Sequence, residues 1–249
     1  MAILGIDIGG SGIKGAPVDL KTGTFAEERY RVTTPQPSDV KQVVAAVSEV
    51  AAQFKGTDHV GITFPGVILS GVAKTAANID NSWINAPARD LFADALGRPV
   101  VVINDADAAG TAEMAFGAGR DQAGVTVVLT FGTGIGSAIF VDGTLLPNTE
   151  FGHLLIGGDD AELRTSDHAR DVDGLSWHKW AKRVQHYLEY VERLISPNLF
   201  IIGGGVSKKS DKFLPEIHIS TPIVAAGLHN DAGIVGAAIA ADLAAKHGH

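Results

Sequence analysis

The chain of 249 residues contains no cysteine. Disulfide bonds, thiolate metal sites and a cysteine nucleophile are therefore excluded. Long hydrophobic runs are also missing at the N-terminus, where the first apolar stretch reaches Asp7 within a few residues. A membrane helix needs about 20 apolar residues, so we expect no signal peptide, no membrane partner and a cytoplasmic location.

Positive charge is scarce. Twenty lysines and arginines stand against 28 aspartates and glutamates, which gives a formal charge of −8. Nucleic-acid-binding proteins usually carry a basic excess or a basic stripe, so we expect no nucleic-acid partner. A polyanionic ligand remains compatible with this composition where basic residues cluster locally.

Hydrophobic residues and glycine are plentiful, at 45% of the chain and 30 residues respectively. This length and composition can form one large domain or two smaller ones. Short β-branched runs, such as residues 2–8, alternate with segments of helical periodicity, such as residues 39–54 and 175–194. This alternation predicts an α/β fold.

One internal repetition is apparent. Residues 5–19 and 129–142 each combine an apolar strand, a glycine turn with a hydroxyl residue, and a second strand. Gly10–Gly15 also matches the dinucleotide pattern GxGxxG, but that fingerprint opens a helix, whereas the residues here are β-like and include Pro17. A strand–turn–strand unit can instead bind phosphate with backbone N–H groups; two ordinary hairpins are the alternative.

Asn104 and Asp105 follow an apolar run at 100–103 that predicts a strand buried on both faces, and they open a predicted helix at 105–116. Ligands of open α/β sheets bind at the carboxyl ends of strands, so Asp105 is a candidate catalytic residue. The alternative role for Asp105 is that of a helix N-cap. Asp107 is the other acidic candidate and faces another direction on the helix.

Taken together, DIGGSGIKG, the Asn104–Asp105 step, LTFGTGIGSA and EFGH resemble the ROK sugar kinases, relatives of hexokinase and actin. Within that family, GIDIGGSGIKGAPVDL, SWHKWAKRVQHYLEYVERLISPNLFIIGGGVSKKSDKFLP and AGIVGAA are similar to the polyphosphate glucokinases and glucomannokinases. The resemblance implies two ribonuclease-H-like domains of the actin and hexokinase type around a central cleft. They would comprise residues 1–103 with a C-terminal helix at 231–249, and residues 104–230.

The resemblance also implies a role for each motif. Asp105 would be the base that accepts the proton of the 6-hydroxyl of glucose. The residues expected to bind the sugar are Asn104, Asp105, Gly66, Glu150, His153 and Glu162. Those expected to bind donor phosphates are Gly9, Gly10, Ser11, Gly12, Lys14, Gly132, Thr133 and Gly134. Those expected near the rest of the donor are Gly203, Gly204, Gly205, Lys208 and Lys209.

The expected cofactor is Mg²⁺, with Asp7 nearby, and no zinc is expected. Many ROK proteins have a zinc motif, CxCGxxGCxE, just after the histidine, whereas this chain has LLIGGDDAELR there. His153 is therefore expected to bind the sugar directly. Glu162 is expected to replace the glutamate that ends the zinc motif.

The implied activity is transfer of a phosphoryl group from inorganic polyphosphate, with ATP as a further donor, to glucose. The alternatives are a strictly ATP-dependent ROK kinase and a sugar-binding ROK protein without catalysis. A ROK repressor would need an N-terminal helix-turn-helix, whereas a strand is predicted here from residue 2, so we do not expect a repressor. An actin-like filament protein is a third class, and it would need a longer chain. The long helix at 175–194 and the family both favour a homodimer.

Overall fold

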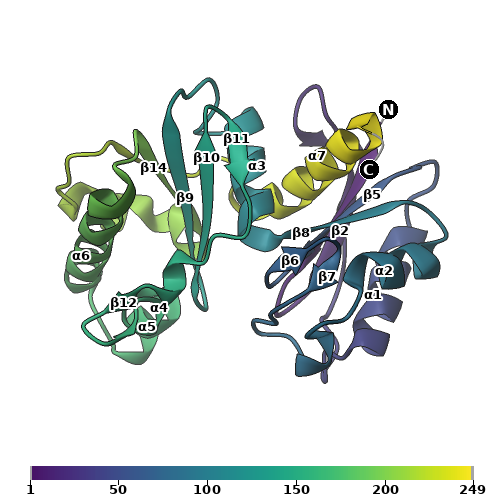
Figure 1. Cartoon of the computed structure of the whole chain (residues 1–249), viewed down its shortest axis with the longest axis horizontal. Helices are drawn as coiled ribbons and strands as arrows, with labels where there is room; N and C mark the ends of the chain where they lie inside the picture. Colours follow the sequence, from purple (N-terminus) through teal and green to yellow (C-terminus); the bar gives the residue numbers. More distant parts are fainter. Residues whose placement is uncertain (1, 248–249) are drawn as a thin grey trace. The chain divides into compact units, whose positions relative to one another are not determined.

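The computed structural model describes residues 2–247. Its contacts divide the chain into two compact units. Unit 1 runs up to Ala112 and resumes at Asp231, and unit 2 comprises Glu113–Asn230. The chain passes from one to the other within helix α3 (Asp105–Phe116) and again just before helix α7 (Ala232–His247) (Figure 1).

Unit 1 is built on a sheet with the strand order β3-β2-β1-β5-β8, and a further strand, β4, also pairs with β2. β1 is antiparallel to β2, whereas β1, β5 and β8 run parallel. The strands are β1 (Ile3–Ile8), β2 (Ile13–Asp19), β3 (Thr24–Phe25), β4 (Tyr30–Val32), β5 (Val60–Phe64) and β8 (Val100–Asn104). The predicted strand after the first glycine turn is confirmed as β2, so this turn does not open a helix.

Helices cover both faces of this sheet. On one face, α1 (Val40–Ala52) and α2 (Ala88–Leu96) pack their buried apolar residues against the strands. On the other face, α7 lies against β1 and β5 (Figure 1). Gly5 and Gly61 permit this approach, since a Cβ at either position would collide with the backbone carbonyls of Ile234 or Ala237. Glycine at these two strand positions thus lets the backbone of α7 pack close to the sheet.

The strand at 100–103 differs from the prediction in its burial. β8 ends the hydrogen-bonded order of the sheet, and its residues alternate between buried and half-buried, with Val101 and Ile103 half-buried. An edge strand has a neighbour on one side only, so a continuous apolar run does not ensure burial on both faces. The rest of unit 1 consists of β6 (Ile68–Leu69), β7 (Val72–Ala73) and η1 (Asn81–Trp83).

Unit 2 repeats the plan with the strand order β11-β10-β9-β14-β15. β9 and β10 form an antiparallel hairpin around the second glycine turn, and β9, β14 and β15 run parallel. The predicted repetition of strand, glycine turn and strand is therefore confirmed. The strands are β9 (Val125–Phe131), β10 (Ile135–Val141), β11 (Thr144–Leu146), β14 (Leu199–Gly204) and β15 (Ile223–Ala225). As predicted, Asp142 and Gly143 turn the chain from β10 to β11, both with positive φ.

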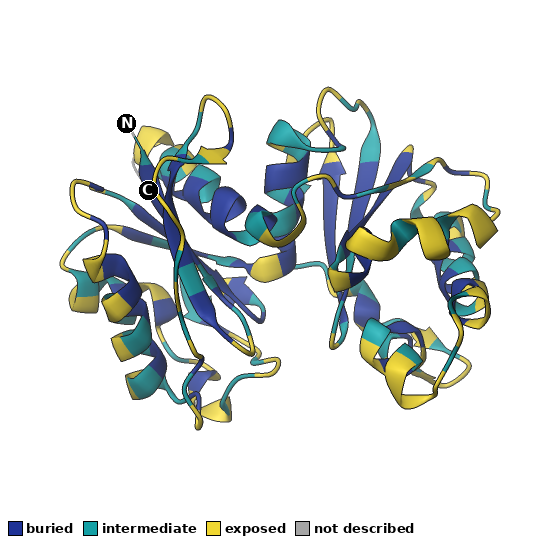
Figure 2. Ribbon diagram, turned by 180° about the vertical axis from the view of Figure 1, so that it is seen from behind, coloured by how far each residue is buried: buried dark blue, intermediate teal, exposed yellow. Residues whose placement is uncertain are grey.

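The long helix α6 (Trp177–Ile195) covers one face of this second sheet. Its buried residues include Trp180 and Tyr187, whose rings lie edge-on to Phe131 at centroid distances of 5.7 and 6.2 Å. Figure 2 shows the central strands of unit 2 in dark blue, as expected for a core between sheet and helix. The other elements are η2 (Phe151–His153), β12 (Leu155–Ile156), β13 (Asp159–Asp160), α4 (Glu162–Thr165), α5 (Asp167–Val172), η3 (Gly205–Lys212), η4 (Leu214–Glu216) and η5 (His229–Asp231).

Candidate active site

The first glycine turn connects β1 to β2 and is closed by a backbone hydrogen bond of 3.1 Å from Gly9 N to Gly12 O. Side chains hold it from outside. Thr34 Oγ1 donates to Gly9 O at 2.5 Å, and Arg31 Nη2 donates to Ser11 O at 2.7 Å. Gly10 and Ser11 are exposed, so the tip of a well-supported turn faces outward.

Asp7 precedes this turn and has two side-chain partners. Its Oδ2 lies 3.0 Å from Lys14 Nζ, and its Oδ1 accepts a hydrogen bond of 2.6 Å from Thr63 Oγ1. The same threonine oxygen accepts the backbone N–H of Ile8 at 3.0 Å. Asp7 and Lys14, expected to serve metal and phosphate, are thus brought together, and Thr63 orients the carboxylate.

Asn104, Asp105 and Gly66 also lie together. Asn104 Oδ1 accepts the backbone N–H groups of Ala106 at 2.9 Å and Asp107 at 3.0 Å, and its Nδ2 donates to Gly66 O at 3.2 Å. Asn104 therefore caps α3. Asp105 is exposed, whereas Asp107 is only 1% exposed, so Asp105 is the acidic residue of this pair that a ligand can reach.

Parallel pairing explains why these residues share one edge of the sheet. Each of the three parallel strands β1, β5 and β8 ends one or two residues before a residue of the candidate site. These residues are Gly9 after β1, Gly66 after β5 and Asp105 after β8. Carboxyl ends of parallel strands meet at a common edge, where α/β proteins bind ligands. Unit 1 therefore presents a glycine turn, an ion pair and an exposed carboxylate along one edge.

The second glycine turn is closed by a hydrogen bond of 3.0 Å from Gly132 N to Gly134 O. Glu162 Oε2 accepts the N–H of Ile135 at 3.0 Å, and a Cβ on Gly134 would collide with this carboxylate. Thr133 at the tip is exposed. Glu162, which is expected to bind the sugar, thus supports the second glycine turn.

His153 lies among three carboxylates. Its Nδ1 is 2.9 Å from Asp160 Oδ2 and 3.9 Å from Glu162 Oε1, and its Nε2 is 4.0 Å from Glu150 Oε2. The hydrogen bond with Asp160 raises the pKa of His153; partial burial lowers this pKa, and the charges of Glu162 and Glu150 raise it further. Burial raises the pKa of Glu150, against the opposing effect of His153. His153, Glu150, Asp160 and Glu162 thus form one cluster of side chains.

The third glycine segment follows β14. Ser207 Oγ donates to Gly204 O at 2.9 Å and lies 3.2 Å from His229 Nδ1. Glu113, 1% exposed, accepts the N–H groups of Gly227 at 3.0 Å and Leu228 at 2.7 Å. The segment is therefore tied through Ser207 and His229 to the loop after β15, which Glu113 holds against α3.

Lys208 and Lys209 in η3 are both exposed. Lys209 Nζ lies 5.6 Å from the ring centroid of Trp177, and the guanidinium of Arg170 lies 4.1 Å from the same centroid. Arg170 is held by Asp167 and Asp171 at 2.9 and 2.6 Å. The positive charge that remains for an anionic ligand in this region is therefore that of the lysines.

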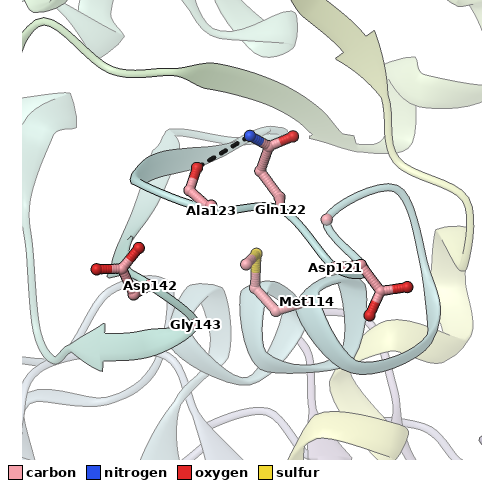
Figure 3. Close-up of a pocket in the computed structure, with 7 residues that line it drawn as sticks. Met114, Asp121, Gln122, Ala123, Asp142 and Gly143 are labelled. Carbon is pink, nitrogen blue, oxygen red and sulfur yellow. Dashed lines mark hydrogen bonds between the residues drawn. The ribbon is translucent and has the colours of Figure 1, made fainter.

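A pocket of about 330 Å³ lies elsewhere in unit 2, beside the end of α3 and the β10–β11 turn (Figure 3). Its lining residues are Met114, Gly119, Asp121, Gln122, Ala123, Asp142 and Gly143. None of these residues belongs to the glycine turns or to the group around His153.

Over residues 2–247, no cluster of three or more histidine, aspartate or glutamate side chains has an arrangement suited to a metal ion. In the same part of the chain, no helix combines the length and the apolar character needed to cross a membrane.

Comparison with known proteins identifies the family. The model of the ROK family matches residues 3–168. The chain belongs to the ROK family. It is 50% identical over 237 residues to the polyphosphate glucokinase of Mycobacterium tuberculosis (strain CDC 1551 / Oshkosh), covering 95% of this chain and 89% of that protein.

Solved ROK structures share the fold. The inorganic polyphosphate/ATP-glucomannokinase from Arthrobacter sp. strain KM superposes with a TM-score of 0.93 at 52% identity, covering 97% and 98% of the two chains. A ROK family glucokinase from Streptomyces griseus, in complex with glucose and AMPPNP, gives a TM-score of 0.82 at 25% identity over 98% and 100%. The predicted family and the predicted α/β fold of the actin and hexokinase type are confirmed.

Sequence reasoning missed four residues that the structure adds to these groups: Thr63, Arg31, Asp160 and Glu113. Thr63 sits within a buried strand, and Asp160 lies in a strongly polar loop. One signal was available for Asp160, because its acidic side chain is close in sequence to His153. Nothing in the sequence linked Glu113 to the loop at Gly227.

Proposed function

We propose that this ROK protein is a sugar kinase that transfers a phosphoryl group from inorganic polyphosphate, and also from ATP, to the 6-hydroxyl of glucose. The observation that carries the proposal is its 50% identity to a polyphosphate glucokinase over 95% of the chain. Its glycine turns are the second support, since both offer exposed tips at the carboxyl ends of strands, where backbone N–H groups can bind phosphate.

Asp105 is proposed as the general base. A sugar hydroxyl attacks poorly until its proton is accepted, and a positioned carboxylate typically contributes about 10²–10⁴ in rate. Asn104, Gly66, Glu150, His153 and Glu162 are proposed to bind the sugar hydroxyls. The Asn104 side chain already caps α3 and contacts Gly66, so we assign its second Nδ2 hydrogen to the sugar.

The donor phosphates are assigned to the turns at Gly9–Gly12 and Gly132–Gly134 together with Lys14, and the remainder of the donor to Gly203–Gly205, Lys208 and Lys209. The residues fit a magnesium ion held largely by water and donor oxygens, because Asp7 offers a carboxylate beside the first turn. When bound, Mg²⁺ would neutralise charge on the transferring phosphoryl group. A homodimer in the cytoplasm is proposed as the working state.

The test is a coupled assay for glucose 6-phosphate with polyphosphate or ATP as the donor. Turnover with both donors is expected, and polyphosphate turnover should fall steeply with salt because lysines release counterions from a polyanion. Turnover with ATP alone would leave a strictly ATP-dependent kinase. Glucose binding without product from either donor would indicate a sugar-binding protein without catalysis.

A further inference from the structure

Four polar residues lie in register across four strands of the first sheet. Arg31 of β4 pairs with Lys14 of β2, Lys14 with Asp7 of β1, and Asp7 with Thr63 of β5. Residues paired in this way project from the same face of a sheet. The polar row, as we call Arg31, Lys14, Asp7 and Thr63, therefore occupies one face immediately beside the first glycine turn.

Asp7 of the polar row lies close to the start of α7. A Cβ on Gly233 would lie 2.9 Å from the Asp7 carboxylate, so glycine lets the first turn of this helix approach the row. Backbone N–H groups at a helix N-terminus carry partial positive charge. The surroundings of the row thus favour an anion, beyond the charges of its own side chains.

The charges within the row do not cancel. Lys14 is paired with Asp7 at 3.0 Å, and Asp7 also accepts the Thr63 hydroxyl. Arg31 is exposed, and within residues 2–247 it forms no ion pair. Arg29, two positions earlier, does form one, with Asp231 at 3.0 Å. Arg31 therefore leaves one positive charge unmatched at the turn.

The position of the Arg31 guanidinium is set by the turn itself. Its Nη2 donates to Ser11 O at 2.7 Å. A Cβ on Gly12 would come within 2.5 Å of Nη2 and 2.6 Å of Cζ, so only glycine allows the guanidinium to lie here. A guanidinium has five N–H donors in a rigid fork, and one contact to Ser11 leaves others for a ligand.

We propose that Arg31 binds phosphoryl oxygens of the donor beside the first glycine turn and is a donor-binding residue of this kinase. The proposal rests on the function proposed above. A planar guanidinium matches the oxygens of a phosphate in a bidentate manner, which an ammonium group cannot do. The ligand class is a polyanionic phosphate chain or a nucleoside triphosphate, bound through phosphate.

The experiment measures binding of tripolyphosphate, without glucose, by calorimetry to the parent, Arg31→Met, Arg31→Lys and Lys21→Met. Lys21→Met is the matched control, since this substitution removes one exposed cation from the turn that follows β2. Arg31→Met should weaken binding at least about tenfold, Arg31→Lys should have an intermediate effect, and Lys21→Met should stay within about twofold of the parent. Steady-state kinetics should show a raised KM for the donor with an unchanged KM for glucose.

A purely structural role for Arg31 would raise both KM values or lower stability without a selective loss of tripolyphosphate binding, and would overturn the proposal. A parent that does not bind tripolyphosphate would also overturn it. If Arg31→Met does not fold, Arg31→Lys decides the matter: tripolyphosphate binding and kinetics equal to those of the parent would overturn the proposal. Arg31-dependent binding of tripolyphosphate without glucose phosphorylation would instead refute the proposed function and leave the phosphate site in place.

Discussion

Lys14 Nζ lies 3.0 Å from Asp7 Oδ2, directly across the β1–β2 hairpin. Both side chains are less than one-fifth exposed, so each depends on the other to offset the cost of burial. Removal of one partner from such a pair leaves a poorly solvated charge behind. We therefore expect the pair to stabilise the fold, in addition to the role in donor binding that we propose for it.

Lys14→Met should therefore lower the free energy of unfolding by about 1–3 kcal/mol, and it should raise the KM for the donor. Urea unfolding and donor kinetics measure the two effects. Lys21→Met, which removes an exposed lysine from the same hairpin region, should change stability by less than about 0.5 kcal/mol. Parental stability in Lys14→Met would show that the ion pair contributes nothing to the fold.

Asp105→Asn tests the general base. Because Asn104 caps α3, the substitution should leave the helix intact while kcat falls by about 10² or more. Asp94→Asn in α2 is a matched control that removes one exposed carboxylate from the same unit and should keep parental kcat. Near-normal kcat in Asp105→Asn, with the protein folded, would remove Asp105 from the mechanism.

The sequence allowed Asp105 to be singled out because strand, polar step and helix are contiguous, so its position depends only on local order. The sequence offered the N-cap of α3 as the alternative role of Asp105, whereas in the structure Asn104 caps the helix. The roles of Arg31 and Glu113 do not follow from local order. Arg31 meets Lys14 only through the register of β4 on β2, and Glu113 accepts N–H groups more than 110 residues away.

The apolar run at 100–103 illustrates a second limit. Its composition predicted a strand correctly, but composition carries no information on how many neighbours a strand has. β8 is hydrogen-bonded only to β5 in the sheet order, and its alternate residues are half-buried. Strand order is a tertiary property, since it depends on which distant segments pair.

Gly10→Ala and Gly132→Ala separate phosphate binding from folding. A Cβ at Gly132 would meet no atom within 4 Å, a Cβ at Gly10 only Asn78 at 4.0 Å, and neither residue has left-handed φ. Both variants should keep parental stability within about 0.5 kcal/mol. The KM for the donor should nevertheless rise at least about tenfold, because a phosphate must approach the backbone where the methyl group stands.

Gly61→Ala is the contrasting control, since its Cβ would collide with the backbone of α7, and it should lose about 1–3 kcal/mol or more. Thermal unfolding and donor kinetics on the three variants decide the matter. Unchanged donor KM values in both turn variants would argue against phosphate binding at these turns.

Asp160→Asn should lower the pKa of His153, because the hydrogen bond with Asp160 is the largest contribution that raises this pKa. The pKa of His153 in the folded protein lies above its ordinary value of 6.5, so the Asp160 interaction stabilises the fold fully below that pH. The stabilisation is lost as pH rises through the raised pKa. The difference in the free energy of unfolding between the parent and Asp160→Asn should therefore be larger at pH 6 than at pH 9.

NMR titration of the histidine ring protons gives the pKa of His153 directly. The variant His153→Gln identifies its resonance among those of the nine histidines. An unchanged pKa of His153 in Asp160→Asn would show that the 2.9 Å contact between His153 Nδ1 and Asp160 Oδ2 does not control the protonation of His153.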